Sequence, residues 1–137
     1  MGLGALTLAV ALAGACGSDE DDEGGQPPPR EPSFEDLAAD AEDLTGQPAV
    51  TVAVPDNRFE PVAVVVDAGT TVTWENVGRN DHNVTPAEEG AFEGVVTDEF
   101  APDATHEATF DEPGTYGYFC SVHGTAGQGQ RGVVVVS

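Results

Sequence analysis

Residues 113–124 read Pro113-Gly114-Thr115-Tyr116-Gly117-Tyr118-Phe119-Cys120-Ser121-Val122-His123-Gly124. The aromatic run up to Cys120 favours a strand. A thiolate at Cys120 and an imidazole at His123 then follow three positions apart, and a further imidazole is available upstream at His82. Two imidazoles and one thiolate are the trigonal ligand set of a blue-copper electron-transfer site. The sequence therefore predicts a metal centre at the end of this strand.

These cysteine and histidine residues alone leave other chemistry open. A Cys-x-x-His turn also occurs in zinc sites, although such sites usually recruit more cysteines. The other cysteine of the chain, Cys16, lies in a segment of different character. A catalytic thiol would need a third group to orient its histidine, and the sequence identifies none. Copper is favoured, and another metal, a structural thiol or a catalytic thiol remain as alternatives.

The sequence around this motif has the two-residue period of β structure. Val72 and Trp74 are expected on one face of a strand, with Thr71, Thr73 and Glu75 on the other. Further strands are predicted at residues 50–54, 62–66, 105–110, 115–120 and 131–137, separated by turn signals such as Asp67-Ala68-Gly69 and Glu112-Pro113-Gly114. Short strands at this spacing predict an all-β domain, an antiparallel sandwich, over residues 49–137.

The chain begins with a segment of small and apolar residues. Residues 1–15 are too few to span a bilayer as a mature helix, and they resemble the apolar core of a secretion signal. Cys16 follows Leu12-Ala13-Gly14-Ala15, a pattern that resembles a bacterial lipoprotein cleavage site. Cys16 is therefore a candidate for lipidation, and an ordinary cleaved signal is the alternative.

Residues 16–48 are predicted to be an acidic, proline-rich linker. Charge repulsion over residues 19–23 and the stiffness of residues 27–29 leave the first part little to bury, so it is expected to be disordered. A short helix is predicted over residues 34–44, with Ser33 as its N-cap. This helix would either dock on the β domain or continue the linker.

The chain of 137 residues carries a formal net charge of −21, with 25 acidic residues against four basic ones. This charge argues against nucleic acid or an anionic membrane surface as a partner. Contact with a membrane is expected only through a lipid at Cys16. The acidic residues are spread along the chain, which favours a solvated surface suited to high salt over a dedicated face for a basic redox partner.

Four segments resemble the plastocyanin branch of the cupredoxins, namely residues 59–61, 66–76, 81–84 and 113–124. The resemblance runs from about residue 49 to residue 137. It implies a Greek-key β-sandwich with one type 1 copper that cycles between Cu(I) and Cu(II). His82, Cys120 and His123 take the ligand positions in this resemblance. It also implies that His123 lies near the surface and that His82 is more buried.

The fourth ligand position departs from the family pattern, in which it is a methionine. Met1 is the only methionine of the chain. Alignment on residues 131–134 places Gln130 at this position, with Gln128 as the competitor in a shorter loop and a three-coordinate site as the alternative. Stellacyanin-like members of the family use glutamine there, which implies a lower reduction potential. Asn83 matches a family asparagine that links the two ligand loops.

The resemblance implies an exported, monomeric carrier of single electrons between redox proteins. Its expected place is the cell surface or the periplasm, held to the membrane by the lipid at Cys16. The alternative is a copper-storage or copper-delivery protein, although the methionine-rich or multi-histidine surfaces of such proteins are absent from this sequence. No enzyme activity is expected, because a second copper centre would need more than the three histidines present.

Overall fold

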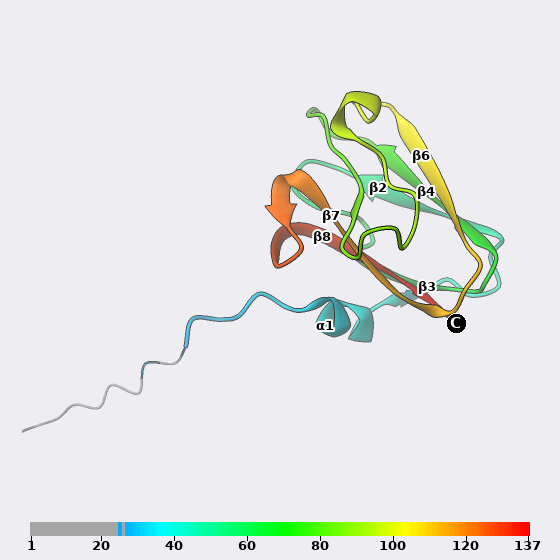
Figure 1. The fold of residues 1–137 in the computed structure, drawn as a ribbon, viewed down its shortest axis with the longest axis horizontal. Coiled ribbons are helices and arrows are strands. Elements are labelled where there is room, and N and C mark those ends of the chain that lie inside the picture. The colour runs from blue at the N-terminus through cyan, green and yellow to red at the C-terminus, as the bar shows by residue number, and fades with distance from the viewer. Residues whose placement is uncertain (1–24, 26) are drawn as a thin grey trace, which may run out of the picture.

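The structure is a computed structural model that describes residue 25 and residues 27–137 (Figure 1). In chain order its elements are α1 (Phe34–Ala39), β1 (Glu42–Asp43), β2 (Ala49–Val54), β3 (Ala63–Val66), β4 (Thr70–Asn76), β5 (Thr85–Pro86), the 3₁₀ turn η1 (Thr97–Glu99), β6 (Thr105–Phe110), β7 (Gly114–Thr125) and β8 (Gln128–Val136). The signal-like residues 1–15 and the lipidation candidate Cys16 lie outside the described residues. None of the helices in the described part of the chain has the length and apolar character needed to cross a membrane.

Two sheets face each other, as Figure 1 shows. One apolar core fills the space between them. The first sheet has the strand order β1-β3-β8-β7-β5, and the second has the order β2-β4-β6. The predicted alternation in β4 is confirmed, because Val72 and Trp74 are buried and Glu75 is exposed. Buried side chains alternate with more exposed ones in β2, β4 and β6, whereas β3 and β8 also bury consecutive residues. Together these strands build the expected β-sandwich.

The pairing of the strands is mixed, so the prediction of a purely antiparallel sandwich was wrong. β2 pairs with β4 in parallel, and β3 pairs with β8 in parallel, whereas β4–β6 and β7–β8 are antiparallel. The chain leaves the second sheet after β2, forms β3 in the first sheet, and returns to form β4 beside β2. Because this crossover separates β2 from β4, the two strands can run in the same direction.

The helix α1 begins where the sequence predicts and ends earlier. The Ser33 hydroxyl accepts a hydrogen bond from the backbone N–H of Asp36 (3.1 Å), and the Asp36 carboxylate accepts one from the backbone N–H of Ser33 (2.8 Å). Such a capping box stabilises a helix N-terminus. The helix ends at Ala39 instead of Leu44, because the chain then joins the edge of the sheet, where the Leu44 N–H donates to the carbonyl of Val65 (2.9 Å).

The segment around α1 docks on the sheet formed by β7 and β8. The ring of Phe34 lies directly on Gly117, where a Cβ would come within 2.6 Å of a ring carbon. The buried Arg131 of β8 donates from Nη1 to the carbonyl of Pro32 (2.6 Å), and its Cζ lies 5.7 Å from the Phe34 ring centroid. An ion pair of 3.5 Å joins Arg131 to Glu31. These contacts show that the segment around the helix docks on the β domain, which is the first of the two alternatives that the sequence left open.

Candidate metal centre

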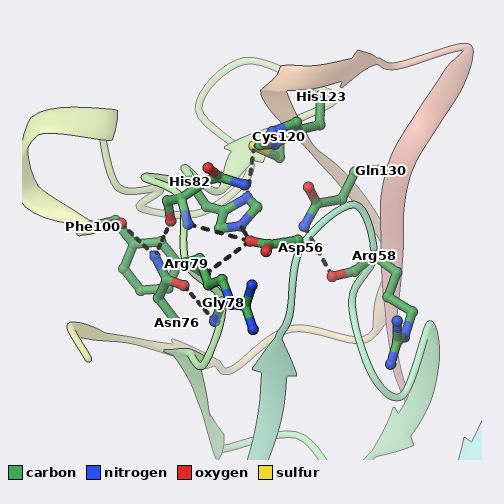
Figure 2. Close-up of polar contacts among 11 residues, drawn as sticks. Asp56, Arg58, Asn76, Gly78, Arg79, His82, Phe100, Cys120, His123 and Gln130 are labelled. Carbon is green, nitrogen blue, oxygen red and sulfur yellow. Dashed lines mark hydrogen bonds and ion pairs between the residues drawn. The ribbon is translucent and has the colours of Figure 1, made fainter. Parts of the chain in front are cut away.

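The side chains of His82, Cys120 and His123 meet at one end of the sandwich (Figure 2). The Nδ1 atoms of both histidines lie 3.7 Å from the Cys120 Sγ, and all three donor atoms lie within 4.8 Å of one another. His82 and Cys120 are fully buried, whereas His123 is partly exposed. The structure therefore brings together the three ligand residues that the sequence predicts. The third histidine, His106, instead places Nε2 at 2.8 Å from the carbonyl oxygen of Glu93.

An interruption in the β7–β8 pairing creates the turn that carries two of these residues. Phe119 pairs with Arg131, and the next pair is Gly124 with Gly129. Four residues of β7, 120–123, therefore lie opposite the single residue Gln130 of β8. A bulge of this kind re-aims side chains out of the regular ladder. Here it turns Cys120 and His123 toward the same point.

The pairing that closes this turn depends on glycine at both positions. Gly129 has a φ of +84°, in the left-handed region that glycine adopts at little cost. A Cβ on Gly124 would lie 2.6 Å from the carbonyl oxygen of Gln128. The close approach of the two backbones thus sets where the turn ends.

The aromatic core holds β7 immediately before the ligand turn. Tyr118 is fully buried two residues before Cys120, with its ring centroid 5.3 Å from that of Trp74 and 4.8 Å from that of Phe59. Its ring also lies directly on Gly132 of β8, where a Cβ would collide with it. Burial raises the pKa of Tyr118 well above its usual range. The phenol is therefore a neutral core group that fixes the position of Cys120.

Asn83 connects the loop that carries His82 to the turn that carries Cys120. Its Oδ1 accepts a hydrogen bond from the backbone N–H of Ser121 (2.9 Å). Its Nδ2 donates to the hydroxyl oxygens of Ser121 (2.7 Å) and Thr97 (2.9 Å). The two parts of the site are thus joined by one side chain whose amide orientation is set by its partners.

Gln130 lies buried beside the three donor residues, as Figure 2 shows. Its Nε2 donates to the carbonyl oxygen of Arg58 (2.9 Å), which sets the orientation of the amide. Its Oε1 is buried and makes no hydrogen bond within the described residues. A buried acceptor without a partner costs about 1–3 kcal/mol, and this oxygen is therefore available to accept a ligand. Gln128, in contrast, is exposed.

Asp56 contacts the far side of His82, and the sequence analysis did not identify it. The Asp56 Oδ1 lies 3.3 Å from the His82 Nε2, and it also accepts hydrogen bonds from the backbone N–H groups of Arg79 (3.0 Å) and Asn80 (3.3 Å). The hydrogen bond from Arg79 is the main reason that the pKa of Asp56 is lowered, and His82 and Asn80 act in the same direction against partial burial. Asp56 follows a proline in a stretch that signals only a turn.

The donor set fits copper. A thiolate and two imidazoles suit a soft or borderline transition metal, whereas magnesium and calcium prefer sites made of oxygen atoms. The unpartnered oxygen of Gln130 adds one potential donor at the same place. The fit therefore rests on the chemistry of the Cys120, His82 and His123 side chains.

Comparison with known proteins agrees with this chemistry. The family model of copper binding proteins, plastocyanin/azurin family, matches residues 48–137. Plastocyanin from Scenedesmus fuscus is 38% identical over 85 residues, which cover 57% of this chain and 85% of that protein. Halocyanin from Natronomonas pharaonis is 39% identical over 102 residues, which cover 71% of this chain and 61% of that protein.

Solved structures share the fold. A purple cupredoxin from Nitrosopumilus maritimus matches with a TM-score of 0.54 at 24% identity, covering 64% of this chain and 99% of that one, and it supports the fold alone. A reduced tryptophan-to-tyrosine mutant of amicyanin matches with a TM-score of 0.52 at 28% identity, covering 73% of this chain and 89% of that one. The extent of the family match and the assembled Cys–His cluster show that this chain belongs to the plastocyanin/azurin family of copper-binding proteins.

Proposed function

We propose that this protein carries single electrons between redox partner proteins and is not an enzyme. The observation that carries the proposal is the Cys–His cluster, whose three donor atoms already lie within 4.8 Å of one another in a rigid β frame. Copper, when bound, supplies a one-electron couple between Cu(I) and Cu(II). Relatives named plastocyanin, halocyanin and amicyanin support a role in electron transfer.

The chain's own residues hold the donors in one arrangement. The bulge at residues 120–123 fixes Cys120 and His123, and Asn83 ties the His82 loop to Ser121. Side chains locked by packing and by outer hydrogen bonds keep a functional site within a narrow range of geometries. A site that cannot rearrange suits an ion that must change oxidation state without changing its ligands.

His123 is proposed as the point where electrons leave and enter. It is the partly exposed member of the cluster, whereas His82 is fully buried. Val122, beside it in the turn, has 51% of its surface exposed. A partner protein that covers Val122 would come close to His123 without opening the core.

Gln130 is proposed as the fourth ligand, through Oε1. The hydrogen bond from Nε2 to Arg58 leaves the oxygen of the amide free for the metal, and that oxygen is buried without a partner within the described residues. Gln128 is exposed and therefore offers no buried amide oxygen to the site. A carbonyl oxygen is a harder donor than a thioether, so it favours Cu(II) and lowers the reduction potential.

The decisive experiment is copper reconstitution of the full-length chain. We expect an intense thiolate-to-copper charge-transfer band, a reversible one-electron wave and fast self-exchange, because one thiolate and two imidazoles are held together. Cys120→Ser should lose the band. Cys16→Ser, which removes the other thiol, should keep it.

Two results would contradict an electron carrier. A colourless protein that prefers zinc would show that the site does not hold type 1 copper. Slow self-exchange together with rapid transfer of Cu(I) to a chelator would favour storage or delivery of the ion instead.

We also propose that residues 1–15 direct export, that Cys16 anchors the mature protein through a lipid, and that the protein is a monomer. The support is the apolar segment followed by the lipoprotein-like sequence at Cys16. Wild-type chain should be found in the membrane fraction, and Cys16→Ser should release it to the soluble fraction. If Cys16→Ser stayed in the membrane fraction, the proposed lipid anchor would be wrong. Sedimentation of the released chain would measure its oligomeric state.

A further inference from the structure

The two ring nitrogens of His82 have different partners. Nδ1 lies 3.7 Å from the Cys120 Sγ, inside the donor cluster, whereas Nε2 lies 3.3 Å from the Asp56 Oδ1 on the opposite side of the ring. A neutral imidazole has one N–H and one lone pair, and the hydrogen bond of one nitrogen decides the role of the other. A carboxylate accepts only, so Asp56 selects the form of His82 that carries its proton on Nε2.

The backbone of residues 78–80 supports the contact between Asp56 and His82. The Asp56 Oδ1 accepts a hydrogen bond from the backbone N–H of Arg79 (3.0 Å), as Figure 2 shows. It accepts a second one from the backbone N–H of Asn80 (3.3 Å). A Cβ on Gly78 would collide with the Asp56 Oδ1 and would lie 3.1 Å from the His82 Nε2. Glycine at position 78 therefore leaves the room in which the carboxylate meets the imidazole.

The negative charge of Asp56 is directed at His82. Within residues 27–137, His82 is the one basic side chain at ion-pair distance from Asp56. The Asp56 side chain is 30% exposed, whereas that of His82 is fully buried. The imidazole thus separates a partly exposed carboxylate from the interior of the donor cluster. His123 has no comparable partner on its outer nitrogen among the side chains of the described residues.

We propose that Asp56 is a positioning residue of the copper site, which presents the Nδ1 lone pair of His82 to the metal and stabilises the oxidised ion through the imidazole. The proposal rests on the proposed function. A carboxylate bound to the outer N–H of a ligand histidine fixes the ring and makes it a stronger donor. A stronger donor stabilises Cu(II) more than Cu(I), because the attraction grows with the charge of the ion.

The first test needs no copper. The imidazole nitrogen resonances of His82 in the copper-free, full-length chain, recorded for the neutral form of the ring, should show one tautomer, with the proton on Nε2. In Asp56→Ala, where the acceptor is lost, the signals should move toward a mixture of both tautomers. A wild-type chain with the proton on Nδ1 would overturn the proposal, whether or not the chain is an electron carrier.

The second test uses the copper-loaded protein. Asp56→Asn keeps the size of the side chain and an oxygen acceptor while it removes the charge. We expect about a tenfold loss in the preference for Cu(II) over Cu(I), which is a rise of about 59 mV in a one-electron potential. Asp56→Glu, which keeps the charge, should stay closer to the wild-type potential than Asp56→Asn.

The matched control is Glu75→Gln, which removes one exposed carboxylate from β4. It should leave both the potential and the His82 tautomer unchanged. Equal shifts in the control and in Asp56→Asn would show a general effect of net charge and would overturn the proposal. An unchanged potential in Asp56→Asn would also overturn the proposal, because Asp56 would then have no influence on the copper site.

Discussion

Two side chains outside the Cys–His cluster bear on the oxidation state that the metal site prefers. In the roles proposed above, Gln130 offers its unpartnered oxygen to the site, and Asp56 acts from behind His82. The first would add a hard donor and the second would strengthen an imidazole donor, so both are expected to favour the more highly charged ion. Because they act through different atoms, we expect their effects on the reduction potential to be separable.

Replacement of Gln130 by methionine should raise the reduction potential. A thioether is a softer donor than an amide oxygen and favours Cu(I). We expect at least a tenfold gain in the preference for Cu(I), which corresponds to about 59 mV for one electron. Spectroelectrochemical titration of the copper-loaded variant measures this change directly.

The control for this substitution is Gln128→Met, the same change at the exposed glutamine two residues earlier. It should leave the potential at the wild-type value. A shift of the potential in Gln128→Met with none in Gln130→Met would show that Gln128, and not Gln130, is the fourth ligand. Unchanged potentials in both variants would support a three-coordinate site.

The ligand residues were predictable from the sequence, whereas the residue behind His82 was not. Cys120 and His123 lie in one short motif, and the aromatic strand before them favours a metal site at its end. Asp56 lies 26 positions before His82, and its loop has the composition of an ordinary turn. Only the fold brings the two together, so no local pattern could have indicated the contact.

At the level of elements, the segment around α1 packs against the sheet of β7 and β8. Phe34 covers Gly117, and Arg131 reaches back to Pro32. The residues before the β domain are thus partly ordered by the domain itself. Arg131 directly follows Gln130, so this contact also restrains the strand that carries the proposed fourth ligand.

Phe34→Ala should loosen this segment. The ring is half-buried, so its loss is expected to cost about 1–2 kcal/mol of the free energy of unfolding. Limited proteolysis should cut residues 27–41 faster than in the wild-type chain, and urea titration measures the loss of stability. Glu35→Ala, at the exposed neighbouring position, is the control. Equal cleavage rates in Phe34→Ala and the control would show that the ring does not hold the segment.

The strands themselves followed from the alternation of apolar residues, and their pairing did not. The alternation of Val72 and Trp74 shows which face of β4 is buried, but it carries no information on which strand lies beside it. The parallel pairing of β2 with β4 arises because the chain visits the other sheet in between. Similarly, the end of α1 was decided by hydrogen bonds at the edge of β3, which helix propensity cannot anticipate.

Over the whole molecule, the charge of −21 should make stability depend on ionic strength. Repulsion among like charges destabilises a compact state, and salt screens it. The Debye length falls from about 30 Å at 0.01 M to about 3 Å at 1 M salt. We therefore expect the melting temperature to rise across this range. Sodium chloride and potassium chloride should act alike, and a flat or falling melting curve would contradict the expectation.

The ladder between β7 and β8 closes on both sides of the ligand turn, at Phe119–Arg131 and at Gly124–Gly129. The backbone of the turn is therefore set by the hydrogen bonds of the sheet, independently of the ion. Many small metal sites form only when the polypeptide folds around the metal, so that a chelator unfolds them. We therefore expect loading and folding to be separate events, so that copper can be withdrawn with a chelator and returned while the polypeptide keeps its native state.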